Sequence, residues 1–170
     1  EFILFSIIFI HDFITVNGEY RGPLNDFSIN DLELTLGKKT KINGNIEMKG
    51  LPNIDKTSID FDIHESQVYA VDVKQYIPKN VHKFATLFSP VLFHATFEGL
   101  ISDFITKGKF STGIGYIESD VELNLKESKY NGKILTKNFD IGRLTEKEDL
   151  VGLLDIQASI NNGHGFLFDN

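Results

Sequence analysis

The chain has 170 residues, of which 41% are hydrophobic and 24% charged, the composition of an ordinary folded domain or of a piece of a longer protein. Its net charge of −7 argues against partners that need a basic surface, namely nucleic acid and the headgroups of anionic lipids. It contains no cysteine, which excludes disulfides, zinc–thiolate sites and cysteine nucleophiles.

The first predicted element is the mostly apolar segment FILFSIIFI at 2–10. It is shorter than the about 18 apolar residues that a membrane span needs. It could be the core of a truncated signal peptide or a strand buried on both faces, and we favour the strand. Because the chain begins at Glu1 and its only methionine is Met48, we expect a processed product or, preferably, an interior fragment.

A two-residue period dominates the rest of the chain. It is clearest at 41–50, 58–63, 117–125 and 153–160, where apolar residues alternate with polar ones. Such alternation is typical of antiparallel strands with one apolar and one solvated face. Turns rich in Gly, Asn and Pro separate these segments, and we expect about ten strands.

Helical patterns are few. In the segment at 78–92, apolar residues share one helical face, Asn80 is a candidate N-cap, and Ser89-Pro90 is a stop signal. The segment at 145–152 begins with a capping-box pattern formed by Thr145 and Glu148. These helices are too short to be crossovers in repeated βαβ units, so a doubly wound fold is excluded.

The turn sequence YRGPLNDF at 20–27 is repeated in its order of residue types as FEGLISDF at 97–104. Each copy is followed by a strand, a glycine turn and a strongly alternating strand. This predicts a single β-rich segment, 1–170, with repeat units at 13–50 and 90–125, unless two turns converged on one pattern. The glycines are expected at positive φ, the aspartates to bond the turn backbone and the phenylalanines to anchor the next strand: Gly22 and Gly99, Asp26 and Asp103, Phe27 and Phe104.

No constellation of residues predicts an enzyme. The histidines lack the spacing of a zinc site, and each is expected on the surface or at a rim: His11, His64, His82, His94 and His164. Carboxylates occur in pairs on strands, Asp60 with Asp62 and Asp120 with Glu122, but a solvated face explains them better than a glycosidase pair. The glycine-rich STGIG at 111–115 lacks a phosphate-binding lysine and is interpreted as a hairpin turn or bulge. No metal or other cofactor is expected.

The predicted sheet has one large apolar face. Ten strands of about ten residues would make a sheet about 33 Å by 50 Å. A second sheet could cover the apolar face, the sheet could close into a barrel, or it could curl into a half-pipe whose floor meets lipid tails. Composition does not choose among these three arrangements.

Three patterns in the chain resemble the TamB-like proteins of Bacteroidetes-type bacteria, a translocation and assembly module group akin to the AsmA-like proteins. The first is G-x-x-x-D-F followed by a strand and a glycine. The second is GLPNIDKTSIDFDI, and the third is Y-x-G-x-I-x-T-x-x-F-D-I-G-R-L, here Tyr130 to Leu144. Together they span nearly the whole chain after residue 12.

The resemblance implies repeated antiparallel β-meanders that form a curled sheet, a half-pipe or taco-like groove, with one or two short helices. It implies a periplasmic protein of the bacterial envelope, anchored in the inner membrane, that moves phospholipids to the outer membrane and takes part in its assembly. The implied partners are phospholipid acyl chains and, through parts absent from this chain, an outer-membrane barrel protein. This chain would be a middle segment.

The alternatives are a structural or adhesive extracellular β-module with a dry core and a small carrier of lipocalin type. In the first unit, the change of phase between Ile29 and Leu32 predicts a bulge at Asn30-Asp31. Under the groove interpretation the inward residues of the clearest strands line the lumen, and they suit a plain core equally well: Leu32, Leu34, Leu36, Ile42, Ile46, Met48, Ile59, Phe61, Ile63, Phe110, Ile117, Val121, Leu123, Leu125, Ile134, Ile156 and Ile160.

Overall fold

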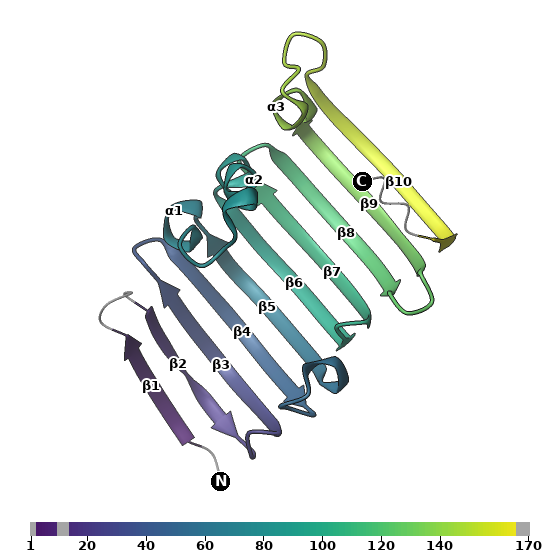
Figure 1. The fold of residues 1–170 in the computed structure, drawn as a ribbon. Helices are drawn as coiled ribbons and strands as arrows, with labels where there is room; N and C mark the ends of the chain where they lie inside the picture. The colour runs from purple at the N-terminus through teal and green to yellow at the C-terminus, as the bar shows by residue number, and fades with distance from the viewer. Residues whose placement is uncertain (1–2, 10–13, 166–170) are drawn as a thin grey trace.

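Ten strands form a single antiparallel sheet in which each strand pairs with the strand next to it in the chain (Figure 1). The computed structural model describes residues 3–9 and 14–165, without the side chains of residues 4–9. The all-β class, the antiparallel meander and the expected number of strands are confirmed. The strands are β1 (Ile3–Phe9), β2 (Ile14–Arg21), β3 (Asp26–Leu36), β4 (Thr40–Lys49), β5 (Ser58–Val68), β6 (Val91–Leu100), β7 (Asp103–Thr112), β8 (Gly115–Asn124), β9 (Lys129–Asp140) and β10 (Leu153–His164).

The apolar segment at the N-terminus is a strand over Ile3–Phe9, as predicted. It pairs with β2 along its whole length and occupies one edge of the sheet. The predicted burial of this segment on both faces stays a prediction, because the side chains of residues 4–9 are not among the described ones. The ends of the segment and His11 also lie outside the described residues.

Short helices occupy three of the connections between strands. The 3₁₀ helix η1 (Ile54–Lys56) joins β4 to β5, and α1 (Ala70–Val73), η2 (Lys79–Val81) and α2 (His82–Phe88) join β5 to β6. The fifth, α3 (Ile141–Thr145), follows β9. The three α-helices lie together at one end of the strands (Figure 1).

The helix predicted at 78–92 is shorter than its pattern. Only His82–Phe88 is α-helical, and Asn80 belongs to the preceding 3₁₀ turn. The N-cap residue is Val81, which makes no side-chain cap, so the predicted capping role of Asn80 is wrong. The stop signal is confirmed, because α2 ends immediately before Ser89.

The capping box predicted at Thr145 and Glu148 is also wrong. Helix α3 ends at Thr145, because the next residue, Glu146, takes the left-handed conformation, with φ of 58°, that terminates helices. The N-cap is Asp140, whose carboxylate accepts a hydrogen bond from the backbone amide of Arg143 at 3.0 Å. The competing cap lies five residues earlier than the pattern suggested.

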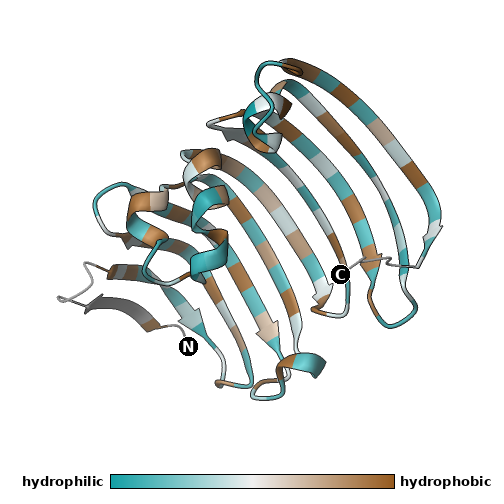
Figure 2. Cartoon of the chain, turned by 45° about the horizontal axis from the view of Figure 1, so that its top comes forward, coloured by the Kyte–Doolittle hydropathy of each residue, from teal (hydrophilic) through white to brown (hydrophobic). Residues whose placement is uncertain are grey.

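Strand pairing puts residues of like polarity opposite one another. Phe93 of β6 faces Phe110 of β7, which in turn faces Ile117 of β8, while Lys109 faces Glu118 on the other side of the sheet. Each strand therefore presents apolar residues to one face and polar residues to the other, seen as alternating bands in Figure 2. We call these the apolar face and the charged face.

No second layer covers the apolar face within the described residues. A compact monomer of this mass would expose about 8,400 Å², whereas the chain exposes 11610 Å². Among the described side chains the buried hydrophobic residues are few: Leu32, Ile59, Ala70, Ile114 and Phe139. Because β1 and β10 remain separate edges in the strand order, the sheet is open, neither a sandwich nor a closed calyx.

The bulge predicted at Asn30-Asp31 is confirmed. The β3–β4 register shifts between Ile29 and Leu32, and Asp31 takes a φ of 50°. The amide of Asp31 has left the ladder and donates to the side-chain oxygen of Asn45 at 3.1 Å. The bulge restores Leu32 to the apolar face that Ile29 occupies, so the floor stays apolar through the irregularity.

The same arrangement recurs at the other end of the sheet. Asn138, with φ of 49°, donates its amide to Asp155 Oδ1 at 2.7 Å. Asn162, with φ of 54°, donates its amide to Asn131 Oδ1 at 2.7 Å. At each site a side chain of the neighbouring strand satisfies a main-chain group that regular pairing has left without its ladder partner.

The two copies of the repeated turn share their glycine geometry. Gly22 and Gly99 have φ of 97° and 131°, as expected. In each turn the glycine lies against the main-chain carbonyl of the aspartate four residues on, where a Cβ would collide. The aspartate thus contacts the glycine through its backbone, whereas its side chain had been expected to bond the turn.

An aromatic pair also closes each copy. Phe27 stacks on Tyr20 with ring centroids 5.6 Å apart, and Phe104 stacks on Phe97 at 4.8 Å. Both phenylalanines therefore anchor the next strand, as predicted, by packing on the aromatic residue two positions before the glycine. This common geometry supports the repeat units at 13–50 and 90–125, which remain a prediction.

Candidate functional site: an uncovered apolar face

The predicted groove residues come together on the apolar face, with one exception. Leu125 lies beyond the last residue of β8, in the turn to β9, where its amide donates to Ser102 O at 2.9 Å. The register joins the others across the sheet from β3 to β10: Leu32, Leu34, Leu36, Ile42, Ile46, Met48, Ile59, Phe61, Ile63, Phe110, Ile117, Val121, Leu123, Ile134, Ile156 and Ile160.

Aromatic rings form the middle of this face. Phe97 of β6 lies 6.0 Å from Phe61 of β5 and 4.8 Å from Phe104 of β7, measured between ring centroids. Phe93 stacks on Phe110 at 6.0 Å. Phe93, Phe97 and Phe104 were not among the predicted groove residues, although the alternation in FHATFEG carried the signal for the first two.

The apolar side chains of this face are more exposed toward β10. Leu32 and Ile59 are only 4% and 6% exposed. Toward the other edge, Ile134 of β9 is 43% exposed and Ile160 of β10 is 46% exposed. The face is therefore most accessible to a guest near β9 and β10, whereas Ile46 of β4 and Leu123 of β8 are half-buried.

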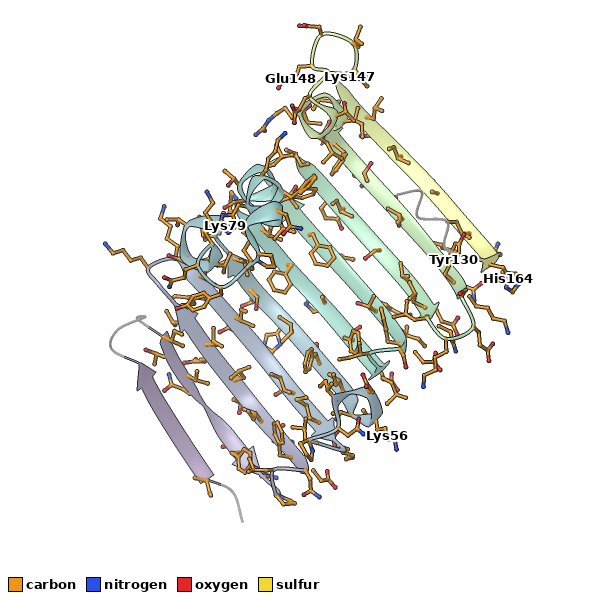
Figure 3. The ribbon with its side chains drawn as sticks, in the orientation of Figure 1. Lys56, Lys79, Tyr130, Lys147, Glu148 and His164 are labelled. Atoms are coloured by element: carbon orange, nitrogen blue, oxygen red, sulfur yellow. The ribbon has the colours of Figure 1, made fainter. Side chains whose placement is uncertain are left out.

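An aromatic ring covers the glycine on the edge strand. The ring of Tyr130 on β9 lies over Gly163 of β10, at the end of the sheet where Figure 3 labels Tyr130 and His164. Gly163 is paired directly with Tyr130 in the ladder. The ring fills the space that the missing side chain leaves, so the apolar surface continues to the edge.

The charged face carries cross-strand ion pairs. Lys107 lies 3.3 Å from Asp120 and Lys109 lies 3.8 Å from Glu118, all with well-exposed side chains. Tyr116 donates a hydrogen bond to Glu118 at 3.1 Å, and burial followed by this contact raises the pKa of Tyr116. Exposed pairs of this kind contribute little to stability, and the face is a solvated surface.

A hollow of about 910 Å³ extends over β6 to β10, and it is walled mainly by this charged face. Its lining includes His94, Lys107, Lys133 and Gln157, together with Ile134 of the apolar set. The hollow therefore does not coincide with the predicted groove. What distinguishes the apolar face is the absence of a covering layer among the described residues, not a closed pocket.

The candidate catalytic residues remain dispersed. Asp60, Asp62 and Glu122 are exposed on the charged face, and Asp120 is engaged with Lys107. His64, His94 and His164 are exposed on strands, and His82 contacts the carbonyl oxygen of Ile77 through Nε2 at 3.1 Å. Within the described residues no three of His, Asp and Glu gather as metal ligands would. Residues 111–115 lie at the β7–β8 hairpin turn, as predicted.

One carboxylate attaches the helical connection to the sheet. The Asp72 side chain on α1 accepts hydrogen bonds from the backbone amides of Lys38, Lys39 and Thr40, at 3.2, 2.9 and 2.8 Å. Burial acts to raise the pKa of Asp72, but these amides outweigh it and the pKa is lowered. The clamp holds α1 against the β3–β4 turn.

The motif FDIGRL at 139–144 binds β9 to the β7–β8 turn. Phe139 packs on Phe88 of α2 with ring centroids 6.3 Å apart. The amide of Asp140 donates to Ile114 O at 2.7 Å, and Arg143 Nη1 donates to Gly113 O at 3.0 Å. These contacts give the motif a structural role at the helical end of the sheet.

No protein-family model, curated protein or solved structure matches the chain. The resemblance to TamB-like proteins therefore depends on the sequence patterns alone. Among the described residues, the helices are all too short to span a bilayer.

Proposed function

We propose that this chain is a segment of a periplasmic conduit of the TamB-like kind, whose apolar face accommodates phospholipid acyl chains on their way to the outer membrane. One observation carries the proposal, namely a ten-stranded open sheet with a continuous apolar face that the described residues leave uncovered. In this role the full-length protein is anchored in the inner membrane and meets an outer-membrane barrel protein through other parts.

The physical argument is the hydrophobic effect. Each CH₂ group that leaves water stabilises binding by about 0.8 kcal/mol, with no directional contact required. Acyl chains that lie on the floor near Ile134, Ile156 and Ile160 would remove half-exposed apolar surface from water on both partners. The charged face stays hydrated on the other side, so the sheet has only one side on which lipid can lie.

The alternative functions need features that the described residues do not supply. A structural or adhesive module with a dry core needs a second layer, and a carrier of lipocalin type needs paired edge strands. Within residues 3–9 and 14–165 there is one sheet, and its edges β1 and β10 do not pair. A conduit needs neither a second layer nor paired edge strands.

Photo-crosslinking tests the proposal with neighbouring residues as controls. A photoreactive amino acid replaces Ile46 or Leu123 on the apolar face, and Asn45 or Glu122 on the charged face of the same strands. The protein is irradiated in cells with labelled phospholipid. We expect lipid adducts at positions 46 and 123, and few at positions 45 and 122.

Equal labelling of both faces would mean that lipid reaches the chain without selection, and it would contradict the conduit. An absence of adducts at both floor positions would contradict it as well. Protein adducts at positions 46 and 123 without lipid would favour a covered, structural module instead.

A further inference from the structure

The helical end of the sheet carries a patch that is both basic and apolar. It consists of the β3–β4 turn and the α1–η2–α2 connection, and we call it the basic helical patch. Its cations are Lys38, Lys39, Lys74, Lys79 and Lys83, and its exposed large apolar residues are Val71, Tyr76, Val81 and Phe84. Val71 is 72% exposed and Phe84 is 51% exposed.

The charge of the patch is opposite to that of the chain. Residues 37–40 and 69–90 contain five lysines and a single carboxylate, Asp72, in a chain whose net charge is −7. That carboxylate is occupied by three backbone amides of the β3–β4 turn. Lys83 pairs with Glu146 beyond α3, and Lys38 and Lys79 are exposed. With Glu146 counted, five lysines face two carboxylates, so the patch carries a net charge of +3 in a chain of net charge −7.

The patch is held as one unit. Besides the Asp72 clamp, Thr40 Oγ1 accepts a hydrogen bond from the amide of Tyr69 at 3.0 Å, and Ser89 Oγ accepts one from the amide of Ala70 at 3.0 Å. Both ends of the helical connection are therefore attached, and its apolar residues stay presented at the end of the strands. Figure 3 places Lys79 at this end, and Lys56 at the opposite end.

We propose that the basic helical patch docks on the surface of a bilayer that contains anionic phospholipid. Lysines that outnumber the carboxylates around them are attracted to anionic headgroups, and exposed valine and phenylalanine side chains can enter the boundary between headgroups and acyl chains. Tyr76 suits this boundary because its ring is apolar and its hydroxyl group is polar. This proposal is independent of what the apolar face of the sheet carries.

Vesicle co-sedimentation of the whole chain tests the charge. The vesicles contain phosphatidylcholine alone, or with about a third replaced by phosphatidylglycerol, at low and at high salt. We expect binding to the anionic vesicles that weakens with salt. The variant K38E/K79E should bind at least about 30-fold more weakly, since each lost lysine alone weakens binding about fivefold and the new carboxylates repel the headgroups. The control variant K56E/K126E changes the charge equally, with both substitutions in connections at the opposite end.

A second variant tests the apolar residues. V71S/F84S keeps every charge and removes only exposed side chains, so the fold should persist, as circular dichroism and the melting temperature would verify. We expect it to bind anionic vesicles roughly fivefold more weakly than the unchanged chain. Unchanged binding by V71S/F84S would overturn the insertion of these side chains and with it the docking mode.

Other outcomes would overturn the proposal in distinguishable ways. Equal losses in K38E/K79E and K56E/K126E would assign binding to the charge of the whole molecule. Tight binding to neutral vesicles that neither charge variant affects would assign it to the apolar face of the sheet. If the unchanged chain binds no vesicles, docking on a bilayer is overturned, and a protein becomes the expected partner of the patch. Lipid adducts at positions 46 and 123 would be unaffected by any of these results.

Discussion

At the scale of residues, single polar side chains stabilise the backbone where it departs from regular pairing. Asn45, Asn131 and Asp155 each accept the amide of a bulge residue on the adjacent strand. Asp72 does the same for three consecutive amides of a turn. The three bulge hydrogen bonds lie at exposed sites, where each contributes about 0.5–1.5 kcal/mol, so these residues favour the bulges at their positions.

The Asp72 clamp predicts an acid-sensitive contact. Because the pKa of Asp72 is lowered in the folded chain, its stabilising effect is complete above its ordinary pKa of about 3.9 and is lost as the pH falls through the folded value. Backbone NMR shifts of Lys39 and Thr40 should be constant near neutral pH and move below about pH 4.

Asp72→Asn isolates this effect. The amide offers one acceptor oxygen where the carboxylate offers two, so we expect a loss of about 1 kcal/mol in unfolding free energy at neutral pH and no acid step in the Lys39 and Thr40 shifts. Asp149→Asn, at an exposed site in the loop before β10, should leave both the stability and the step unchanged. A persistent step in Asp72→Asn would exclude Asp72 as the titrating group.

The turn glycines predict a position-specific cost for alanine. Gly99→Ala would put a Cβ against the carbonyl of Asp103 at a φ of 131°, so we expect a loss of about 2–3 kcal/mol in denaturant unfolding. Gly152→Ala, where a Cβ meets nothing within 4 Å, is the matched control and should change stability by less than about 0.5 kcal/mol. Equal effects at the two sites would contradict the close approach.

At the scale of elements, cross-strand contacts within one layer replace the usual packing of one layer on another. The rings of Phe61, Phe97 and Phe104 join β5, β6 and β7. Such pairs are the unit of stabilisation in a sheet, and here they have no second layer above them within the described residues. The strands of this region are therefore stabilised by their lateral neighbours.

Phe97→Ala tests this lateral stabilisation. Removal of a half-buried ring with two aromatic neighbours should cost about 1–2 kcal/mol in the free energy of unfolding, less than for a ring in a closed core. Leu92→Ala, on the same strand but 46% exposed on the opposite face, should cost less than about 0.5 kcal/mol. A similar loss from both variants would mean that the two faces are equally covered.

The glycines of the repeated turn can also be placed by the strands that they follow. Gly22 follows β2, Gly99 lies at the end of β6, and Gly165, with φ of 82°, follows β10, so these three glycines at positive φ are spaced four strands apart, although Gly37, Gly50 and Gly115 also take positive φ at other strand ends. The spacing G-x-x-x-D is repeated a third time from Gly165 to Asp169, although Asp169 lies outside the described residues. Because a Cβ at Gly165 would meet nothing within 4 Å among the described residues, the close approach seen at Gly22 and Gly99 is not repeated within them, and the repeat units remain a prediction.

At the scale of the whole molecule, the chain buries little apolar surface for its length. Its exposed area of 11610 Å² exceeds the about 8,400 Å² of a compact protein of this mass. An open sheet of this kind is stable through its ladders and cross-strand contacts, and its apolar face remains available to lipid, to a partner or to another copy of the chain.

The heat capacity of unfolding measures this openness. A compact chain of this length would show about 2.0–2.6 kcal/mol/K, and we expect a clearly smaller value by calorimetry because less apolar surface is exposed on unfolding. The value should rise, and the melting temperature should depend on concentration, if copies associate through the apolar face. A full-sized heat capacity in a monomer would contradict the open sheet.

The sequence by itself determined which residues share a face, because in a strand the side of each side chain follows from its parity along the backbone. It also predicted the turn glycines and the bulge at Asn30-Asp31, since these depend on local conformation. It placed the helix ends wrongly where a cap from another residue, Asp140, competed with the pattern at Thr145. It included Leu125 because the alternation of the sequence continues one residue beyond the end of β8.

Only the tertiary structure decided whether anything covers the apolar face. Alternating strands are equally compatible with a sandwich, a closed calyx and an open sheet, because the pattern records the polarity of a face and not what lies opposite it. The clustering of basic and apolar residues at one end likewise depends on a fold that brings residues 37–40 beside residues 69–90. Contacts between segments distant in sequence carry this information, and no local period contains it.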